Sequence, residues 1–127
     1  MAVFNFPIGH DDHARHALLA AREIQSRWRS KREAFVEEFG LATSDLGVGI
    51  GIHAGEISFG EFGKSHRDLT AIGTVVNTAS RAQSVATADQ ILVTQEVHKR
   101  VKGDLVDSQA KTYQLKGFGV PVELYSA

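Results

Sequence analysis

The sequence predicts an α+β domain in which helices lie on one face of a mainly antiparallel sheet. Segments with apolar residues at helical spacing alternate along the chain with short segments rich in strand-forming residues. No internal repeat, low-complexity tract or linker interrupts the 127 residues. Since this length suits one hydrophobic core, we expect a single domain over residues 1–127.

The first part of the chain predicts a strand followed by a long helix. Residues 2–6 (AVFNF) are rich in strand formers and end before a proline, so we expect a short strand there. From Asp11 or Asp12, both suitable N-caps, to about Glu38 the apolar residues mostly follow helical spacing, and Gly40 is a suitable end. This pattern predicts a long amphipathic helix, with a break near Ser30 as an alternative.

A glycine-rich segment at residues 46–63 predicts a strand, a tight turn near Gly55 and a second strand. Valine or isoleucine at positions 48, 50 and 52 alternates with glycine at positions 47, 49 and 51. The glycine face would let a helix pack closely on the sheet. Residues 49–54 also fit the loose dinucleotide pattern Gly-x-Gly-x-x-Ala, but a strand follows where that fingerprint requires a helix. We therefore favour the packing interpretation.

The second half of the chain continues the alternation of helices and strands. We expect a helix from about Thr74, a buried strand at residues 90–94, a short helix at 95–101 and closing strands at 111–117 and 120–126.

The amino-acid composition limits the kinds of partner that we expect this chain to bind. The 14 basic and 15 acidic residues leave no basic excess, so we expect no nucleic-acid partner. The absence of cysteine excludes disulfides and thiolate metal sites and agrees with a reducing compartment, with the cytoplasm as default. No stretch approaches the ~20 apolar residues of a membrane span, so we expect no membrane contact by this segment.

Two local motifs suggest binding sites that we disfavour. Residues 63–65 (Gly-Lys-Ser) resemble the end of a phosphate-binding P-loop, but the glycine required five positions earlier is Ser58. A polar hairpin tip is the favoured interpretation, although phosphate contact by the lysine stays open. His10, His13 and His16 could gather a zinc or nickel ion, but a solvated helix start is favoured because their spacing drifts around the helix.

His53 lies in an apolar strand, where a hydrogen-bonded core histidine is more common than a catalyst. Asn77 and Arg81 are a stronger candidate pair, because a separation of four places both on one face of a helix. Arg81 offers a permanent charge and forked donors for phosphate, and Asn77 can donate and accept toward a sugar or a water molecule. An exposed polar face is the structural alternative for this pair.

Several motifs together resemble one known family. They are VGIGIHAGEISFGEFG at residues 48–63, LTAIGTVVNTASRAQS at 69–84, QILVTQEVHKRV at 90–101 and YQLKGFGVPVELY at 113–125. In this order and near this spacing they resemble the class III adenylate and guanylate cyclase catalytic domain over essentially the whole chain. The resemblance implies a ferredoxin-like nucleotide cyclase sheet.

The resemblance also implies roles for individual residues. Asn77 would orient the ribose, and Arg81 would stabilise the charge that develops on the α-phosphate. Thr70, where many animal enzymes have Asp, would read the purine, as in a bacterial adenylate cyclase subgroup. The backbone of Ala71 would contact the base.

The family's metal-binding Asp residues have no counterpart here, because they lie on a first strand and a Gly-Asp-x-x element that would precede residue 1. We therefore expect a partial domain, truncated at the N-terminus, with no metal ligand of its own. The complete domain would use two divalent ions, Mg or Mn, to convert ATP, or GTP, to the cyclic nucleotide and pyrophosphate in signal transduction. Its site would form with a homodimer or cyclase-domain partner. The alternative is a non-catalytic dimerisation or regulatory fragment.

Overall fold

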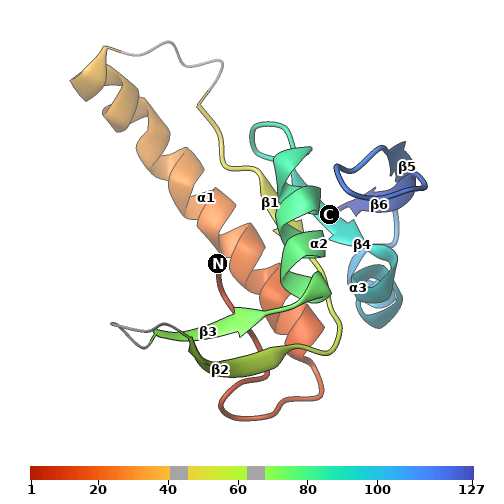
Figure 1. The fold of residues 1–127 in the computed structure, drawn as a ribbon. Coiled ribbons are helices and arrows are strands. Elements are labelled where there is room, and N and C mark those ends of the chain that lie inside the picture. The colour runs from red at the N-terminus through yellow and green to blue at the C-terminus, as the bar shows by residue number, and fades with distance from the viewer. Residues whose placement is uncertain (41–45, 63–67) are drawn as a thin grey trace.

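A four-stranded mixed sheet with strand order β1-β4-β6-β5 forms the centre of the fold (Figure 1). The computed structural model describes residues 1–40, 46–62 and 68–127 of the chain. The strands of this sheet are β1 (Ile50–Ile52), β4 (Ile91–Thr94), β5 (Ala110–Tyr113) and β6 (Val122–Ser126). β1 pairs with β4 in parallel, whereas β6 is antiparallel to both β4 and β5. β1 therefore lies at one edge of the sheet.

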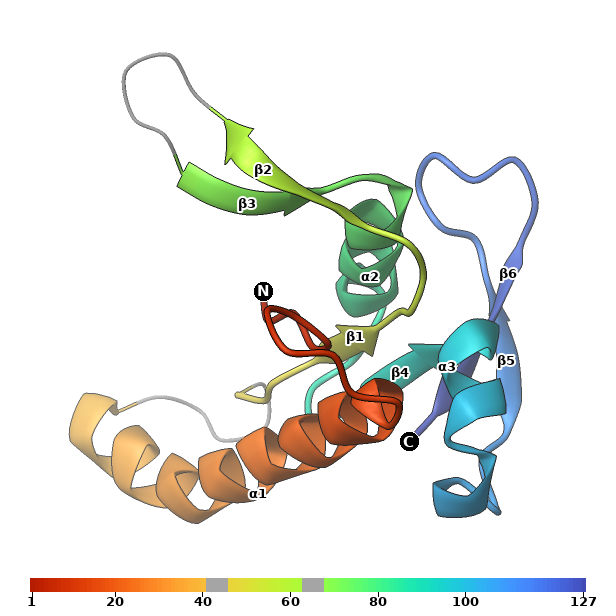
Figure 2. The same cartoon turned by 90° about the horizontal axis from the view of Figure 1, so that it is seen from below.

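Helices cover both faces of this sheet. The helices are α1 (His13–Phe39), α2 (Thr74–Ser84), α3 (Gln95–Arg100) and the 3-10 turn η2 (Lys102–Asp104). Figure 2 shows α1 and α2 on opposite sides of β1. All four residues of β4 are buried, as expected for a strand that is packed on both faces.

Two apolar clusters fill the space between the sheet and its helices. The α1 side contains Ala14, Leu18, Ala21, Ile52, Ile91, Val93, Val97, Val101 and Leu105. The α2 side contains Ala82, Leu92, Leu115 and Leu124. Alternate residues of β4 belong to opposite clusters, because successive side chains of a strand point to opposite faces.

A two-stranded hairpin projects away from the main sheet and leads into α2 (Figures 1 and 2). Its strands are β2 (Ser58–Phe62) and β3 (Asp68–Ile72), which pair antiparallel in the register Ser58 to Ile72 and Phe62 to Asp68. Gly73, with φ 134°, makes the turn from β3 into α2. β3 contains the residues expected to contact the base, and it leads directly into the helix that carries Asn77 and Arg81.

The predicted α+β class and the predicted long helix are confirmed, and the structure corrects two details. The helices were expected on one face but cover both, because β1 and β4 each offer two faces suited to packing. Residues 2–6 form no strand, and no strand in the described part of the chain pairs with them. Asn5 has φ 75° and its Oδ1 accepts a hydrogen bond from the backbone of His10, which bends this segment. Helix α1 continues through Ser30, whose hydroxyl donates to the carbonyl of Arg27 at 2.8 Å.

Candidate active site

Asn77 and Arg81 lie one turn apart on α2, as the sequence predicts. The Asn77 side chain is exposed and that of Arg81 is half-buried, so neither belongs to the core. Among the described residues, neither side chain has a hydrogen-bond or ion-pair partner. An amide and a guanidinium without protein partners have all their donors available for an anionic or polar ligand.

The position of α2 depends on the glycine face of β1. A Cβ built on Gly51 would lie 2.2 Å from the backbone N of Gln83 and 2.6 Å from the backbone O of Ala79. Backbone therefore packs directly against backbone, and Ala82 is fully buried beside this contact. The packing interpretation of the glycines is thus confirmed. Residues 49–54 lead from β1 toward β2 and not into a helix, so they lack the dinucleotide-binding topology.

The two residues expected to contact the base, Thr70 and Ala71, lie in β3. Thr70 is opposite Gly60 and Ala71 is opposite Phe59 in the hairpin register. The structure describes their backbone but not their side chains, so their roles stay predictions. Residues 63–67, including the Lys64 weighed as a phosphate contact, lie outside the described residues.

The amino-terminal histidines make contacts with one another and with a neighbouring helix. The rings of His10 and His16 meet edge to face, with centroids 5.6 Å apart. Nε2 of His13 lies 3.5 Å from Nη1 of Arg100 on α3. Over the described ranges 1–40, 46–62 and 68–127, no three His, Asp or Glu side chains are grouped so that they could hold a metal ion.

His53 follows β1 directly and is hydrogen-bonded, as its predicted role in the core requires. Its Nδ1 lies 2.8 Å from Oγ1 of Thr94 and 3.7 Å from Oε2 of Glu96, and its side chain is only 13% exposed. Burial lowers the pKa of His53 below its ordinary value, although the charge of Glu96 acts in the opposite direction. The imidazole is therefore neutral near pH 7.

A cavity of about 490 Å³ opens beside this histidine. Thr78, the residue after Asn77 on α2, contributes to its wall, whereas Asn77 and Arg81 do not. The other walls come from the start of α3 and from residues 118–123 before and within β6. Sequence reasoning did not find this cavity, because residues from separate elements form it and no local motif marks them.

The comparisons with known proteins identify the family of this chain. The profile of the adenylate and guanylate cyclase catalytic domain matches residues 1–125. The chain belongs to this cyclase family. The curated "Adenylate cyclase" of Anabaena cylindrica is 30% identical to it over 129 residues, which cover 94% of this chain and 25% of that protein.

Solved cyclase structures share the fold of this cyclase domain. The adenylyl cyclase CyaB from P. aeruginosa superposes with a TM-score of 0.82 at 27% identity, covering 97% of this chain and 63% of that chain. The guanylyl cyclase Cya2 superposes with a TM-score of 0.81 at 28% identity, covering 97% of this chain and 61% of that one. This cyclase domain therefore spans less than two thirds of either solved chain and a quarter of the curated relative.

Two further features of the described residues concern metal binding and membrane crossing. Cyclases of this family generally use divalent metal ions, but the side chains that the structure describes here do not fit a metal site. In addition, none of the described helices combines the length and apolar character needed to cross a bilayer.

Proposed function

We propose that this cyclase domain supplies the Asn and Arg half of a nucleotide cyclase site that forms cyclic AMP and pyrophosphate from ATP. The observation that carries the proposal is the pair Asn77 and Arg81, whose side chains have no partner among the described residues, on a helix fixed by backbone contact with β1. The Anabaena relative and CyaB are both named as adenylate cyclases. Thr70 favours ATP through the resemblance, whereas the similarity to guanylyl cyclase Cya2 keeps GTP as the alternative substrate.

The proposed chemistry assigns a separate task to each side chain. In the reaction, the ribose 3′-oxygen attacks the α-phosphate, a new P–O bond forms, and pyrophosphate leaves. Asn77 would hold the ribose so that its 3′-oxygen faces the α-phosphate. The guanidinium of Arg81 would donate to phosphate oxygens whose negative charge grows in the transition state.

A second subunit is needed to complete this site in the proposal. Neither Asn77 nor Arg81 lines the cavity beside His53 or the cavity at the β5–β6 edge of the sheet. Helix α2 thus presents Asn77 and Arg81 at the protein surface, as a composite site at a subunit interface requires. We propose that carboxylates outside this chain hold the metal ions, so that the 127-residue chain alone makes no cyclic nucleotide.

Complementation tests this proposal directly. The partner is a complete cyclase domain of the same family that keeps its metal-binding Asp pair but has both residues corresponding to Asn77 and Arg81 replaced by alanine. We expect neither protein alone to convert ATP with Mg²⁺ or Mn²⁺, and their mixture to form cyclic AMP, detected by chromatography of the product. Parallel assays with GTP decide the substrate.

The matched control uses the Arg81→Ala chain in the same mixture, which should form the same complex without turnover. Turnover by the wild-type chain alone would overturn the half-site proposal. A folded wild-type chain that binds the partner but yields no product would instead support a non-catalytic dimerisation or regulatory module.

A further inference from the structure

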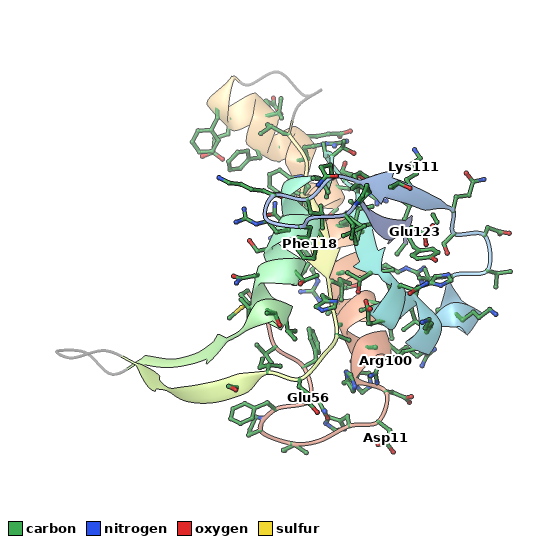
Figure 3. The ribbon with its side chains drawn as sticks, turned by 45° about the vertical axis from the view of Figure 1, so that its right-hand side comes forward. Asp11, Glu56, Arg100, Lys111, Phe118 and Glu123 are labelled. Carbon is green, nitrogen blue, oxygen red and sulfur yellow. The ribbon has the colours of Figure 1, made fainter. Side chains whose placement is uncertain are left out.

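The cavity beside His53 has the volume of a small-molecule site. We call it the His53 cavity and define it by His53, Thr78, Glu96, Phe118, Val122 and Glu123, which all line it. Its volume of about 490 Å³ lies within the usual range of ligand pockets, roughly 300–1,000 Å³. Figure 3 labels Phe118 and Glu123, which contribute from the segment before β6 and from β6 itself.

The charged groups of the His53 cavity are all negative. Glu96 and Glu123 contribute carboxylates, and among the residues that the structure describes no lysine or arginine lines the cavity. His53 adds a neutral imidazole, and the Thr78 hydroxyl already donates to the carbonyl of Thr74 at 2.8 Å. Within the described part of the chain, the Glu123 side chain has no hydrogen-bond or ion-pair partner. Glu123 therefore offers an unpaired acceptor, and the two carboxylates together repel anions such as the phosphates of a nucleotide.

The remaining wall is mixed: Thr94 and Gln95 are polar, whereas Phe118, Pro121 and Val122 are apolar. Phe118 and Val122 are half-buried and pack at the edge of the cluster around Leu124. An aromatic face attracts a cation within about 6 Å, and an apolar wall favours the carbon skeleton of a ligand. Carboxylates and an aromatic ring in one cavity are a combination that can hold an ammonium group attached to an apolar body.

We propose that the His53 cavity binds a small organic cation, an ammonium group carried on an apolar or aromatic body. The ammonium lies between the carboxylates of Glu96 and Glu123, and the body packs on Phe118 and Val122. This site is separate from the proposed nucleotide site and does not depend on it. Because Thr78 follows Asn77 on α2, the bound cation contacts the helix that carries the proposed catalytic residues.

A ligand series on the ¹⁵N-labelled 127-residue chain tests the charge requirement. Benzylamine, benzyl alcohol and benzoate have similar shapes and carry a positive, zero and negative charge. We expect benzylamine to give saturable shifts of the amide signals of His53, Thr78 and Glu123. A charge-assisted contact predicts at least about tenfold weaker binding of benzyl alcohol. Benzoate should cause no shifts at these residues.

Two substitutions test the carboxylates. Glu123→Gln and Glu96→Gln should each weaken benzylamine binding about tenfold, because each replaces a charged acceptor by a neutral amide of similar shape. Glu37→Gln, an exposed residue of α1 distant in sequence from the cavity, is the matched control and should bind like wild type. The amide spectrum of each variant verifies its fold, and if one variant does not fold, the other and the ligand series still decide.

Three results would overturn the proposal. They are equal affinity for benzylamine and benzyl alcohol, unchanged affinity in both folded carboxamide variants, and benzylamine shifts that map away from the six residues that define the cavity.

Discussion

Gly51 on β1 and Gln83 on α2 meet backbone to backbone, so closely that a Cβ on Gly51 would lie 2.2 Å from the Gln83 nitrogen. Real Cβ atoms do not approach other atoms this closely, so any side chain at position 51 must push the helix away. The same helix carries Asn77 and Arg81, and its distance from the sheet sets how far these side chains reach. A strand residue with no side chain thus determines the position of the candidate site.

Gly51→Ala should destabilise the domain by about 1–3 kcal/mol, because overpacking forces backbone to shift. Urea unfolding followed by circular dichroism measures the change. Gly119→Ala is the matched control, because a Cβ at Gly119 would meet nothing within 4 Å. Equal stability of the two variants would show that α2 moves freely on β1, contrary to this packing.

The ion pair between Arg32 and Asp89 should couple α1 to the segment before β4. Nη1 of Arg32 lies 2.8 Å from Oδ2 of Asp89 and also 3.2 Å from the carbonyl of Leu46. Both side chains are partly shielded, at 32% and 23% exposure. A double-mutant cycle with Arg32→Gln and Asp89→Asn should give a coupling energy of about 0.5–1.5 kcal/mol.

Asparagine is chosen at position 89 because Asp89 has φ 58°, which asparagine tolerates. The exposed pair Arg27 and Glu23, joined at 2.6 Å, is the matched comparison and should couple more weakly, by about 0.3–0.5 kcal/mol. A coupling near zero for Arg32 and Asp89 would mean that this contact adds no stability.

The sequence predicted the elements that have strong local signals. The long helix, the alternation of glycine with isoleucine in β1 and the one-turn spacing of Asn77 and Arg81 all depend on neighbours a few residues apart. Residues 2–6 misled the prediction because a strand also needs a pairing strand, which local β-propensity does not supply. The His53 cavity was missed for a similar reason, since its walls come from the residue after β1, from α2, from the end of β4, from the start of α3 and from the segment before and within β6.

His53 should make stability depend on pH between about 7 and 5. Burial lowers its pKa in the folded chain below the ordinary 6.5, so the unfolded chain binds a proton first as the pH falls. The free energy of unfolding should therefore decrease from about pH 6.5 downward, through the lowered folded pKa. Oε2 of Glu96 lies 3.7 Å from Nδ1 of this ring, Glu123 lines the same cavity, and the ammonium of Lys99 acts on Glu96.

The titration of Glu96 does not contribute to the loss of stability between about pH 7 and 5. Burial favours its neutral form, but hydrogen bonds from its own backbone and from Thr94, with the charges of His53 and Lys99, lower its pKa from 4.5. Its titration therefore falls below pH 5. Chemical denaturation at pH 7, 6 and 5 should show a smaller loss of stability in His53→Asn than in wild type. His16→Asn, at an exposed position of α1, should keep the wild-type slope, and an unchanged slope in His53→Asn would refute the assignment.

Arg81→Ala should lower turnover far more than nucleotide binding in the complemented cyclase. The guanidinium has no partner among the described residues, so its removal leaves no buried charge unpaired and should hardly change stability. Negative charge on the α-phosphate grows in the transition state, so the barrier should rise by about 2–4 kcal/mol, or roughly 30- to 1,000-fold in kcat. KM should change by less than about threefold, because ground-state contacts to the rest of the nucleotide remain.

Steady-state kinetics of cyclic AMP formation separates kcat from KM for Arg81 variants. Gln83→Ala, an exposed change on the same helix, should match wild type in both constants. Arg81→Lys should recover only part of the rate, because an ammonium keeps the charge but loses the forked donors. If Arg81→Ala instead raised KM and left kcat unchanged, Arg81 would clamp the bound nucleotide equally in the ground and transition states. Its role would then be to bind the phosphates, and the stabilisation of the reacting phosphate would have to come from another residue of the composite site.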